Sequence, residues 1–404
     1  MLASRPAGLP ALSLQVCTAI TESHLPWARV LAESLAAHHR GDPPLAVLVV
    51  DAPEGGEGES GEPFRLLRPG DVGIDSRELR LRAAMYRPME FTGSMRGALL
   101  GALLDETAGG PVLFLDADVY VLGSLEPLVA QASRDGIVLS PHLLGPPPEP
   151  SPLERELLRA GAHNCGYVAV AGASGARFAG WWAGHLARDC LDDPAEGLFV
   201  SQRWLDLAPS LFDVGMLRDP GSNVTPHNLG SRVVERGGAG WTIDGDPLRF
   251  LHVSGGFDPR ADEWPWLSRQ PAVTTLCREY AAQLLAAGHR SQPDPPFRYR
   301  ATAAGLVLEP WVRRRCRAAV LAGEAFPDPF DPRGTEGFTA WLAEPMDGSL
   351  PAVSRWAMAL RDFRPDLRAV FPAVPGAHTG PYLRWLAEQH EVAVPAPFRP
   401  HAEV

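Results

Sequence analysis

Lysine is absent from the chain, so all 37 of its Lys and Arg residues are arginines. No lysine can therefore act as a base or clamp a phosphate. Arginine would have to bind any phosphate group, and it does so well because its planar guanidinium donates two hydrogen bonds at once. The many Ala, Gly and Pro residues beside this absence are typical of a GC-rich coding bias and indicate nothing about function.

Cysteines and long apolar runs are also scarce. The 5 cysteines are odd in number and lack the paired spacing of a metal site, which predicts free thiols in a reducing compartment. No apolar run reaches about 18 residues, the length that a bilayer requires. The N-terminus lacks a basic segment followed by an apolar core. We therefore expect a cytoplasmic protein without a membrane span.

An excess of positive charge is missing too, since the net charge is -11 and the arginines are scattered. This balance argues against general binding of nucleic acid. The composition is that of an ordinary globular protein, with 45% hydrophobic and 21% charged residues in 404 positions. Such a length suits two or three domains, or one large domain with an appendage.

Two aspartates follow an apolar segment that predicts a strand buried on both faces, residues 112–115. Asp116 and Asp118 come directly after it, and a second apolar run follows. In open α/β sheets, ligands bind outside the carboxyl ends of the strands, and Mg²⁺ and Mn²⁺ prefer oxygen ligands. We interpret the two aspartates as ligands of a divalent cation. The alternative is that they only begin a turn.

The N-terminal segment predicts a parallel βαβ unit. Residues 12–20 and 45–50 have strand character, and residues 26–39 between them have helical spacing. Asp51 follows the second strand, where it would either contact a nucleotide or cap the strand end. The sequence leaves both possibilities open.

Further polar residues lie near predicted element boundaries. Arg96 falls in the first half of a predicted helix over 91–106, and Asn164 and Gly166 precede a predicted strand over 168–171. A glycine there would let the backbone approach a ligand closely, or simply form a turn.

Two later segments also carry candidate residues. Gln202 and Asp206 share a predicted helix over 199–211, one helical turn apart, where polar residues usually form a solvated face. His252 lies near the end of a predicted strand over 248–253 and is followed by Ser254, Gly255 and Gly256. A histidine at a strand end beside a glycine turn is a candidate metal ligand in a chain that also carries two clustered aspartates. The alternative is that His252 has only a structural role.

The C-terminal third differs in character. Residues 1–266 form the expected α/β domain, and residues 267–404 a mainly helical region with helices near 271–288, 310–322, 353–363 and 382–390. Its arginine cluster at 313–317 would be a solvated helix face or, alternatively, a site for an anionic acceptor.

Five segments, in this order, resemble those of GT-A fold glycosyltransferases, and in particular bacterial members similar to the retaining family 8. Asp116-Ala117-Asp118 resembles their D-x-D motif. The other four are His163-Asn164-Cys165-Gly166-Tyr167, Gln202-Arg203-Trp204-Leu205-Asp206, Asn223-Val224 with His227-Asn228-Leu229, and Leu251-His252-Val253-Ser254-Gly255. The resemblance covers about residues 12–265.

This resemblance implies an α/β fold of the GT-A (Rossmann-like) type, a mixed sheet flanked by helices with a mainly helical C-terminal extension. It implies that Asp116, Asp118 and His252 hold Mn²⁺ or Mg²⁺ against the diphosphate of a nucleotide-sugar donor. A UDP-hexose is the default donor by resemblance, and the acceptor is unidentified.

The same resemblance assigns roles to the remaining candidates. Asn164 and Gly166 would line the donor-sugar pocket, and Gly255 belongs to the late segment that supplies the third metal ligand. Gln202 would lie near the anomeric carbon, with Asp206 close by. Arg96 falls where relatives carry a helix lysine near the donor, so it either clamps an anion or lies on the helix surface.

One departure from the family pattern concerns Ser201, which stands where relatives usually carry an aspartate. A serine cannot supply that negative charge, so a catalytically degenerate binding protein is the alternative to an active transferase. A nucleotidyltransferase is a third hypothesis. It ranks last because residues 18–26 lack a glycine-rich, basic phosphate loop.

Overall fold

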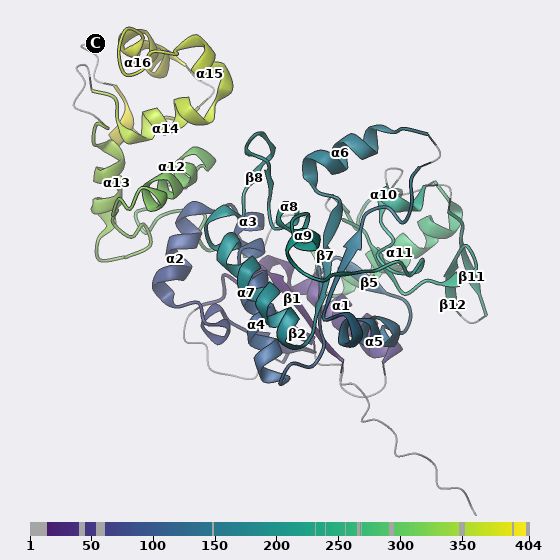
Figure 1. Ribbon diagram of the computed structural model, residues 1–404. Helices are drawn as coiled ribbons and strands as arrows, with labels where there is room; N and C mark the ends of the chain where they lie inside the picture. Colours follow the sequence, from purple (N-terminus) through teal and green to yellow (C-terminus); the bar gives the residue numbers. More distant parts are fainter. Residues whose placement is uncertain are drawn as a thin grey trace, which may run out of the picture. The chain divides into compact units, whose positions relative to one another are not determined.

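The computed structural model describes residues 14–39, 45–53, 61–147, 149–230, 232–238, 240–254, 256–264, 267, 269–290, 295–346, 352–389 and 392–400. They form two compact units: unit 1 takes the described parts of 1–74 and 92–296, and unit 2 those of 75–91 and 297–404 (Figure 1). Unit 1 extends past the boundary expected at residue 266 because α11 (Pro271–Ala286) packs on α1 (Leu25–His38).

Unit 1 is built on a 7-stranded sheet in the order β10-β6-β7-β4-β1-β2-β3. Its strands are β1 (Gln15–Ile20), β2 (Leu45–Val49), β3 (Arg65–Leu67), β4 (Val112–Leu115), β6 (Ile137–Pro141), β7 (His163–Val170) and β10 (Gly215–Met216). Strand β7 runs antiparallel to both of its neighbours, and the other pairs are parallel. The expected α/β class, with a mixed sheet flanked by helices and a helical C-terminal part, is confirmed.

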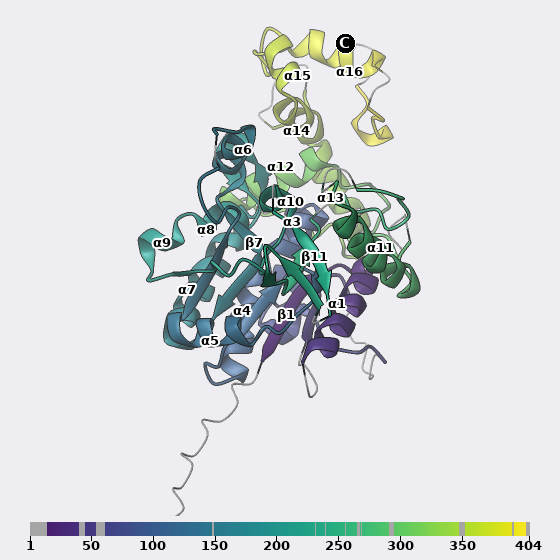
Figure 2. The same ribbon diagram turned by 90° about the vertical axis from the view of Figure 1, so that its right-hand side faces the viewer.

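Both faces of the central strands are covered, which explains their unbroken apolar sequences. Every residue of β1, β2 and β4 is buried. On one face, Val16, Val47 and Leu113 share an apolar core with α1, α5 (Glu126–Asp135) and α11. The other face is covered by α4 (Arg96–Glu106) and α7 (Gly172–Asp189), which lie side by side in Figures 1 and 2.

Shorter elements complete unit 1. A two-stranded sheet joins β5 (Val119–Val121) to β14 (Phe250–His252). The remaining elements are η1 (Glu22–His24), η2 (Pro69–Val72), α6 (Pro152–Ala160), β8 (Asp192–Asp193), η3 (Pro194–Glu196), β9 (Leu198–Phe199), α10 (Pro226–Leu229), β11 (Val234–Gly237), β12 (Gly240–Ile243) and β13 (Asp246–Pro247).

Two predicted helices are broken in the structure. The helix expected over 91–106 is divided into α3 (Pro88–Gly93) and α4, because Gly93 and Ser94 are poor formers of helix interiors. The helix expected over 199–211 begins later and is split into α8 (Gln202–Leu205) and α9 (Ala208–Leu211). Pro209 lies in the first turn of α9, where its missing N–H costs nothing, whereas it would interrupt a continuous helix.

Unit 2 is helical. It contains α2 (Ser76–Met85), α12 (Pro310–Leu321), α13 (Thr335–Ala343), α14 (Arg355–Phe363), α15 (Pro365–Val370), α16 (Thr379–Glu388) and η4 (Ala396–Phe398). Its arginine cluster is neither a solvated face nor an open anion site. Arg313 is buried, and Arg314 and Arg315 form ion pairs with Glu90 and Glu324. Arg313 donates hydrogen bonds to the backbone carbonyls of Ala83, Tyr299 and Leu308.

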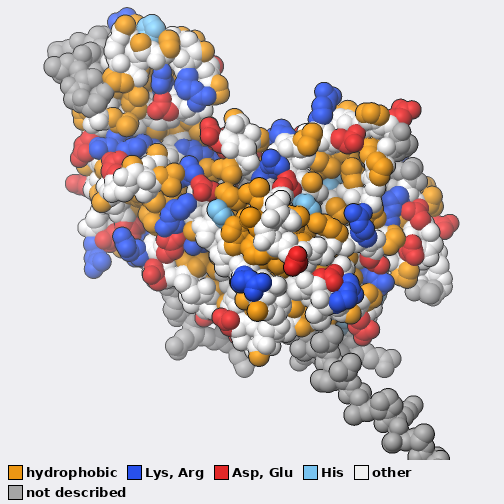
Figure 3. All heavy atoms as spheres, viewed as in Figure 1, with side chains coloured by type: hydrophobic (Ala, Val, Ile, Leu, Met, Phe, Trp, Pro, Cys, Tyr) orange, Lys and Arg blue, Asp and Glu red, His pale blue; other side chains and the backbone are white. Residues whose placement is uncertain are grey.

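Two observations bear on the expectations about membranes and nucleic acid. Among the described residues, no helix combines the length and the hydrophobicity that crossing a bilayer requires. Figure 3 shows arginine and acidic side chains interspersed over the face that it presents. The absence of nucleic-acid binding stays a prediction.

Gly97 allows α4 and α7 to approach closely. A Cβ at Gly97 would lie 2.5 Å from the backbone nitrogen of Ala183 and 2.7 Å from its Cα. We expect Gly97→Ala to lower the free energy of unfolding by about 1–3 kcal/mol, because a helix backbone cannot move aside freely. Urea denaturation followed by circular dichroism measures this change.

Gly101 on the same helix supplies the control, since a Cβ there would meet no atom within 4 Å. We expect Gly101→Ala to raise the free energy of unfolding by about 0.5–1 kcal/mol, because alanine is the better helix former. Equal effects of the two substitutions would contradict this packing.

Candidate functional site

Asp116 and Asp118 occupy the tight turn between β4 and β5. The backbone N–H of Asp116 donates to the carbonyl of Gly166 on β7 (2.9 Å), and the N–H of Val119 donates to the carbonyl of Asp116 (3.1 Å). Both carboxylates therefore lie beyond the carboxyl end of β4, the edge at which α/β sheets bind ligands.

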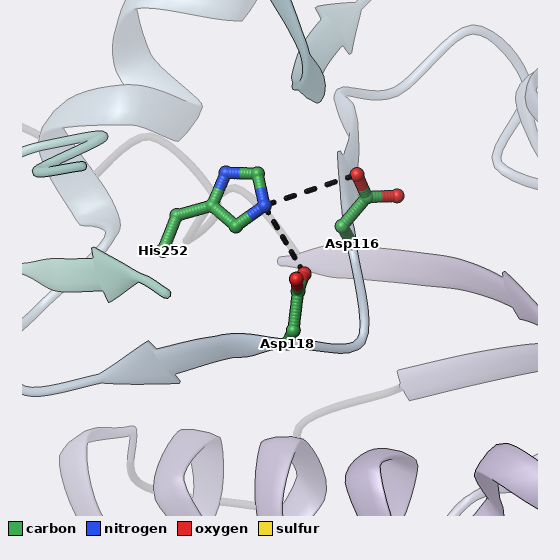
Figure 4. Close-up of side chains that lie close together, drawn as sticks. All are labelled: Asp116, Asp118 and His252. Atoms are coloured by element: carbon green, nitrogen blue, oxygen red, sulfur yellow. Dashed lines mark ion pairs between the residues drawn. The ribbon is translucent and has the colours of Figure 1, made fainter. Parts of the chain in front are cut away.

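His252 reaches the same place through the pairing of β14 with β5. The register sets His252 opposite Val119, and the N–H of His252 donates to the carbonyl of Val224 (2.8 Å). His252 Nε2 lies 3.1 Å from Asp118 Oδ1 and 4.0 Å from Asp116 Oδ2, with both carboxylates turned toward the ring (Figure 4). One ligand atom from each side chain falls within 4.8 Å of the others.

The His252–Asp118 pair is electrostatically complementary. Burial acts to lower the pKa of His252, but the negative charge and hydrogen bond of Asp118 outweigh it and raise that pKa. Burial acts to raise the pKa of Asp118, and the positive charge and hydrogen bond of His252 outweigh it and lower that pKa. A divalent cation bound by the same atoms would replace the imidazole proton, because metals bind the neutral ring.

These side chains suit a divalent cation chemically and sterically. Two carboxylates suit Mn²⁺ and Mg²⁺, and imidazole is a ligand that first-row metals accept. Gly166 leaves the necessary space, since a Cβ there would lie 2.3 Å from Cε1 of His252 and 3.0 Å from Asp116 Oδ2. The expectation that Asp116, Asp118 and His252 lie together is met by the geometry, and metal binding itself stays a prediction.

Asn164 positions the His252 ring. Its Nδ2 lies 3.0 Å from His252 Nδ1 and donates to Asn223 Oδ1 (2.8 Å), and its Oδ1 accepts from the N–H of Gly166 (2.8 Å). Side chains that hold the second nitrogen of a metal-binding histidine fix the orientation of its ring. Sequence analysis placed Asn164 beside the donor sugar, and the structure places its amide against a candidate metal ligand.

Arg96 lies in the site and not on the outer surface of its helix. Its Nη2 donates to Asp116 Oδ1 (2.5 Å), and its Nη1 donates to the carbonyl of Cys165 (2.9 Å). Its guanidinium carbon lies 4.7 Å from the centre of the Phe114 ring. These contacts aim a permanent positive charge at the edge where the carboxylates gather.

Gln202 and Asp206 both contact the segment that leads into β7. Gln202 Nε2 donates to the carbonyl of Ala160 (3.0 Å), and its Oε1 accepts from the N–H of Cys165 (3.3 Å). Asp206 Oδ1 accepts from the N–H of Ala162 (3.0 Å) and lies 3.0 Å from His163 Nδ1. The contacts of Asp206 therefore fix the start of the strand that carries Asn164.

The last two candidates have different outcomes. Asp51 is buried, and its Oδ1 accepts a hydrogen bond from the N–H of Glu22 (2.7 Å). Asp51 thus caps the turn after β1, in agreement with the hypothesis that it has a capping role. Its contact with a nucleotide stays a prediction. Gly255 lies outside the described residues.

Sequence analysis assigned no role to three residues that the structure places at the site: His142 was not considered, and Asn223 and His227 appeared only as members of a family-like segment. Asn223 supports Asn164, and the His142 and His227 rings lie 5.1 Å apart, centre to centre. His142 follows β6 as Asp116 follows β4, and this strand-end position was the available signal.

Some residues at the site have an unusual backbone conformation. Of the non-glycine residues with positive φ in the described chain, Val200 lies two residues before Gln202, Ser254 lies two residues after His252, and Asn223 contacts Asn164. Such backbone outliers gather at functional sites.

Comparison with known proteins gives limited likeness. No protein-family model matches the chain. The uncharacterized protein YfnF of Bacillus subtilis (strain 168) is 25% identical over 245 residues, 59% of this chain and 80% of that protein.

Two solved structures of glycosyltransferases are similar in part. One is the galactosyltransferase LgtC in complex with donor and acceptor sugar analogs, with 17% identity, a TM-score of 0.41, and coverage of 68% of this chain and 96% of that one. The other is GlyE of Streptococcus pneumoniae TIGR4, with 15% identity, a TM-score of 0.40, and coverage of 68% and 63%. Likeness at this level leaves the function to be argued from the side chains of the site.

The space at Gly166 gives a direct test of the metal site. We expect Gly166→Ala to weaken Mn²⁺ binding by roughly tenfold to a hundredfold, because the added methyl group displaces His252 and Asp116. Isothermal titration with Mn²⁺ measures the affinity. Gly180→Ala on α7 is the control, since a Cβ there meets no atom within 4 Å. Equal Mn²⁺ affinities of Gly166→Ala and the unaltered protein would contradict the assignment.

Proposed function

We propose that this chain is a GT-A fold glycosyltransferase that uses Mn²⁺ or Mg²⁺ to transfer a sugar from a nucleotide-sugar to an unidentified acceptor. One observation carries the proposal: Asp116, Asp118 and His252, from segments far apart in the sequence, converge beyond the carboxyl end of β4. Two carboxylates and an imidazole within reach of one another, at the edge where α/β sheets bind ligands, support a cation-dependent role.

The proposed reaction places negative charge at this edge of the sheet. Departure of a nucleoside diphosphate from a sugar leaves charge on a phosphate oxygen. Asp116, Asp118 and His252 would hold the cation that, as a Lewis acid, would stabilise this charge. Arg96 is proposed to bind the same anion. Its guanidinium is already oriented by Asp116 and the Cys165 carbonyl, so little side-chain freedom is lost when the anion binds.

We further propose a UDP-hexose donor and transfer with retention, both of which rest on the family resemblance. Gln202 would lie near the anomeric carbon, in an orientation fixed by its two backbone hydrogen bonds. In a retaining transfer no strong base is needed there, because the departing phosphate can accept the proton of the incoming hydroxyl. Asn164 and Gly166 would border the donor sugar, and Asp206 would act through the start of β7.

A catalytically degenerate protein that binds a nucleotide-sugar is the second candidate, and Ser201 favours it. Ser201 is 1% exposed and follows Val200, whose φ is 39°. It supplies no negative charge beside Gln202. The three intact metal-ligand candidates favour the enzyme, because binding alone does not require stabilisation of a leaving group.

Replacement of one carboxylate separates these candidates. We expect Asp118→Asn to reduce Mn²⁺-dependent release of nucleoside diphosphate by roughly a hundredfold or more, because one ligand of the cation loses its charge. The thermal unfolding midpoint should change little, since this side chain is partly exposed and packs no core. A coupled assay for nucleoside diphosphate measures the rate.

Asp244→Asn is the matched control, because Asp244 is ion-paired with Arg232 (3.0 Å) at the surface and contacts none of the candidate ligands. It should leave the rate unchanged. Full Mn²⁺-dependent turnover by Asp118→Asn would refute the metal assignment.

A further inference from the structure

Several buried polar atoms beside His252 and Gln202 have no hydrogen-bond partner. They are Nδ1 of His227, Nδ2 of Asn223 and a ring nitrogen of His142, whose ring also interacts with the Gln202 side chain. Each buried polar group without a partner costs about 1–3 kcal/mol. Unpartnered buried polar atoms also occur elsewhere in the described residues, for example Thr18 Oγ1 and Tyr280 Oη. What distinguishes this group is its place beside the candidate metal ligands, where a bound molecule can supply the missing hydrogen-bond partners.

These atoms come from segments that meet at one edge of the sheet. His142 follows β6, and its N–H donates to the carbonyl of Ala162, the residue before β7 (2.9 Å). His227 lies in the first turn of α10. The rings of His142 and His227 meet edge to face, with their centres 5.1 Å apart. Asn223 accepts a hydrogen bond from Asn164, which in turn contacts His252. The group therefore adjoins the candidate metal ligands without including one.

Both histidines are neutral near pH 7. Burial and the neighbouring His227 lower the pKa of His142 to about 3, although a hydrogen bond with the Gln202 side chain opposes the shift. Burial and His252 likewise lower the pKa of His227. A neutral imidazole offers one hydrogen-bond donor and one acceptor, and an asparagine amide offers both kinds of atom. A hydroxyl group matches such partners because it donates and accepts at once.

We propose that His142, His227 and Asn223 bind hydroxyl groups of the transferred sugar of the donor, so that these three residues determine donor specificity. This inference rests on the proposed function. The metal ligands would hold the diphosphate, and the group bonded directly to that diphosphate is the transferred sugar. Neutral side chains that adjoin His252, but are not ligands themselves, are placed to contact that sugar.

Binding of two ligands by one variant tests the proposal. The donor that binds the unaltered full-length protein most tightly is selected from a panel of UDP-, GDP- and dTDP-hexoses with Mn²⁺. Isothermal titration then compares this donor with its nucleoside diphosphate, which lacks the sugar. We expect His142→Phe to weaken donor binding by about tenfold, the loss of one or two hydrogen bonds, and to leave binding of the nucleoside diphosphate within about twofold.

Two further variants sharpen the comparison. His142→Gln keeps a donor and an acceptor and should restore part of the donor affinity. His39→Phe is the control, because His39 follows α1 at the opposite edge of the sheet, where its Nε2 accepts from the N–H of Leu125 (3.3 Å). It should change neither affinity. If His142→Phe does not fold, His227→Phe takes its place, since that ring is less buried.

The outcomes are distinguishable. Unchanged donor affinity in a folded His142→Phe protein would overturn this inference and leave the proposed function standing. Equal losses for the donor and the nucleoside diphosphate would also overturn it, because the sugar would then not be the group recognised. If the unaltered protein binds no nucleotide-sugar and no nucleoside diphosphate with Mn²⁺, the proposed function fails and this inference fails with it.

Discussion

The antiparallel pairing of β5 with β14 is the contact on which the candidate site depends. It joins the turn after β4 to a segment more than a hundred residues later and sets His252 opposite Val119. Because side chains alternate along a strand, a shift of one residue would turn His252 away from Asp118. β14 is short, and it is also held by the bridge between Leu251 and Val224. The same bridge brings Asn223 beside Asn164, so one register assembles both the candidate ligands and the residues that orient them.

The candidate site lowers the stability of the folded state, whereas the sheet beneath it raises that stability. Central strands buried on both faces supply stability through apolar packing, whereas the edge above them keeps carboxylates, unpaired imidazole nitrogens and the strained backbone of Val200. A β-branched residue at positive φ costs about 1–3 kcal/mol. Proteins keep such unfavourable local features chiefly at functional sites. The position of these groups beside the candidate metal ligands therefore supports a binding site, and this argument does not depend on any relative.

The sequence predicts the parts of this protein that local pattern determines. The βαβ start, the buried strand before Asp116 and α11 follow from apolar periodicity, and Asp116 and Asp118 follow from their position at a strand end. The broken helices over 91–106 and 199–211 were not predicted, because apolar spacing alone conceals the interruptions at Gly93 and Pro209. The surroundings of His142, Asp51 and Arg313 depend on contacts between distant segments, and no periodicity encodes these. Arg313 shows most clearly what local sequence cannot predict. It belongs to a basic run that suggested a helix surface, but in the interior of unit 2 it donates hydrogen bonds to three backbone carbonyls.

The most direct measurement is a donor screen in which purified protein is incubated with nucleotide-sugars and free nucleoside diphosphate is assayed, with Mn²⁺ and with EDTA. If Asp116, Asp118 and His252 hold a cation against a diphosphate, as proposed, at least one donor should release nucleoside diphosphate, and this release should cease in EDTA. Release that is equally fast in EDTA would contradict the metal-dependent account. Neither release nor binding of any nucleotide-sugar in the panel would contradict the assignment of this chain as a glycosyltransferase.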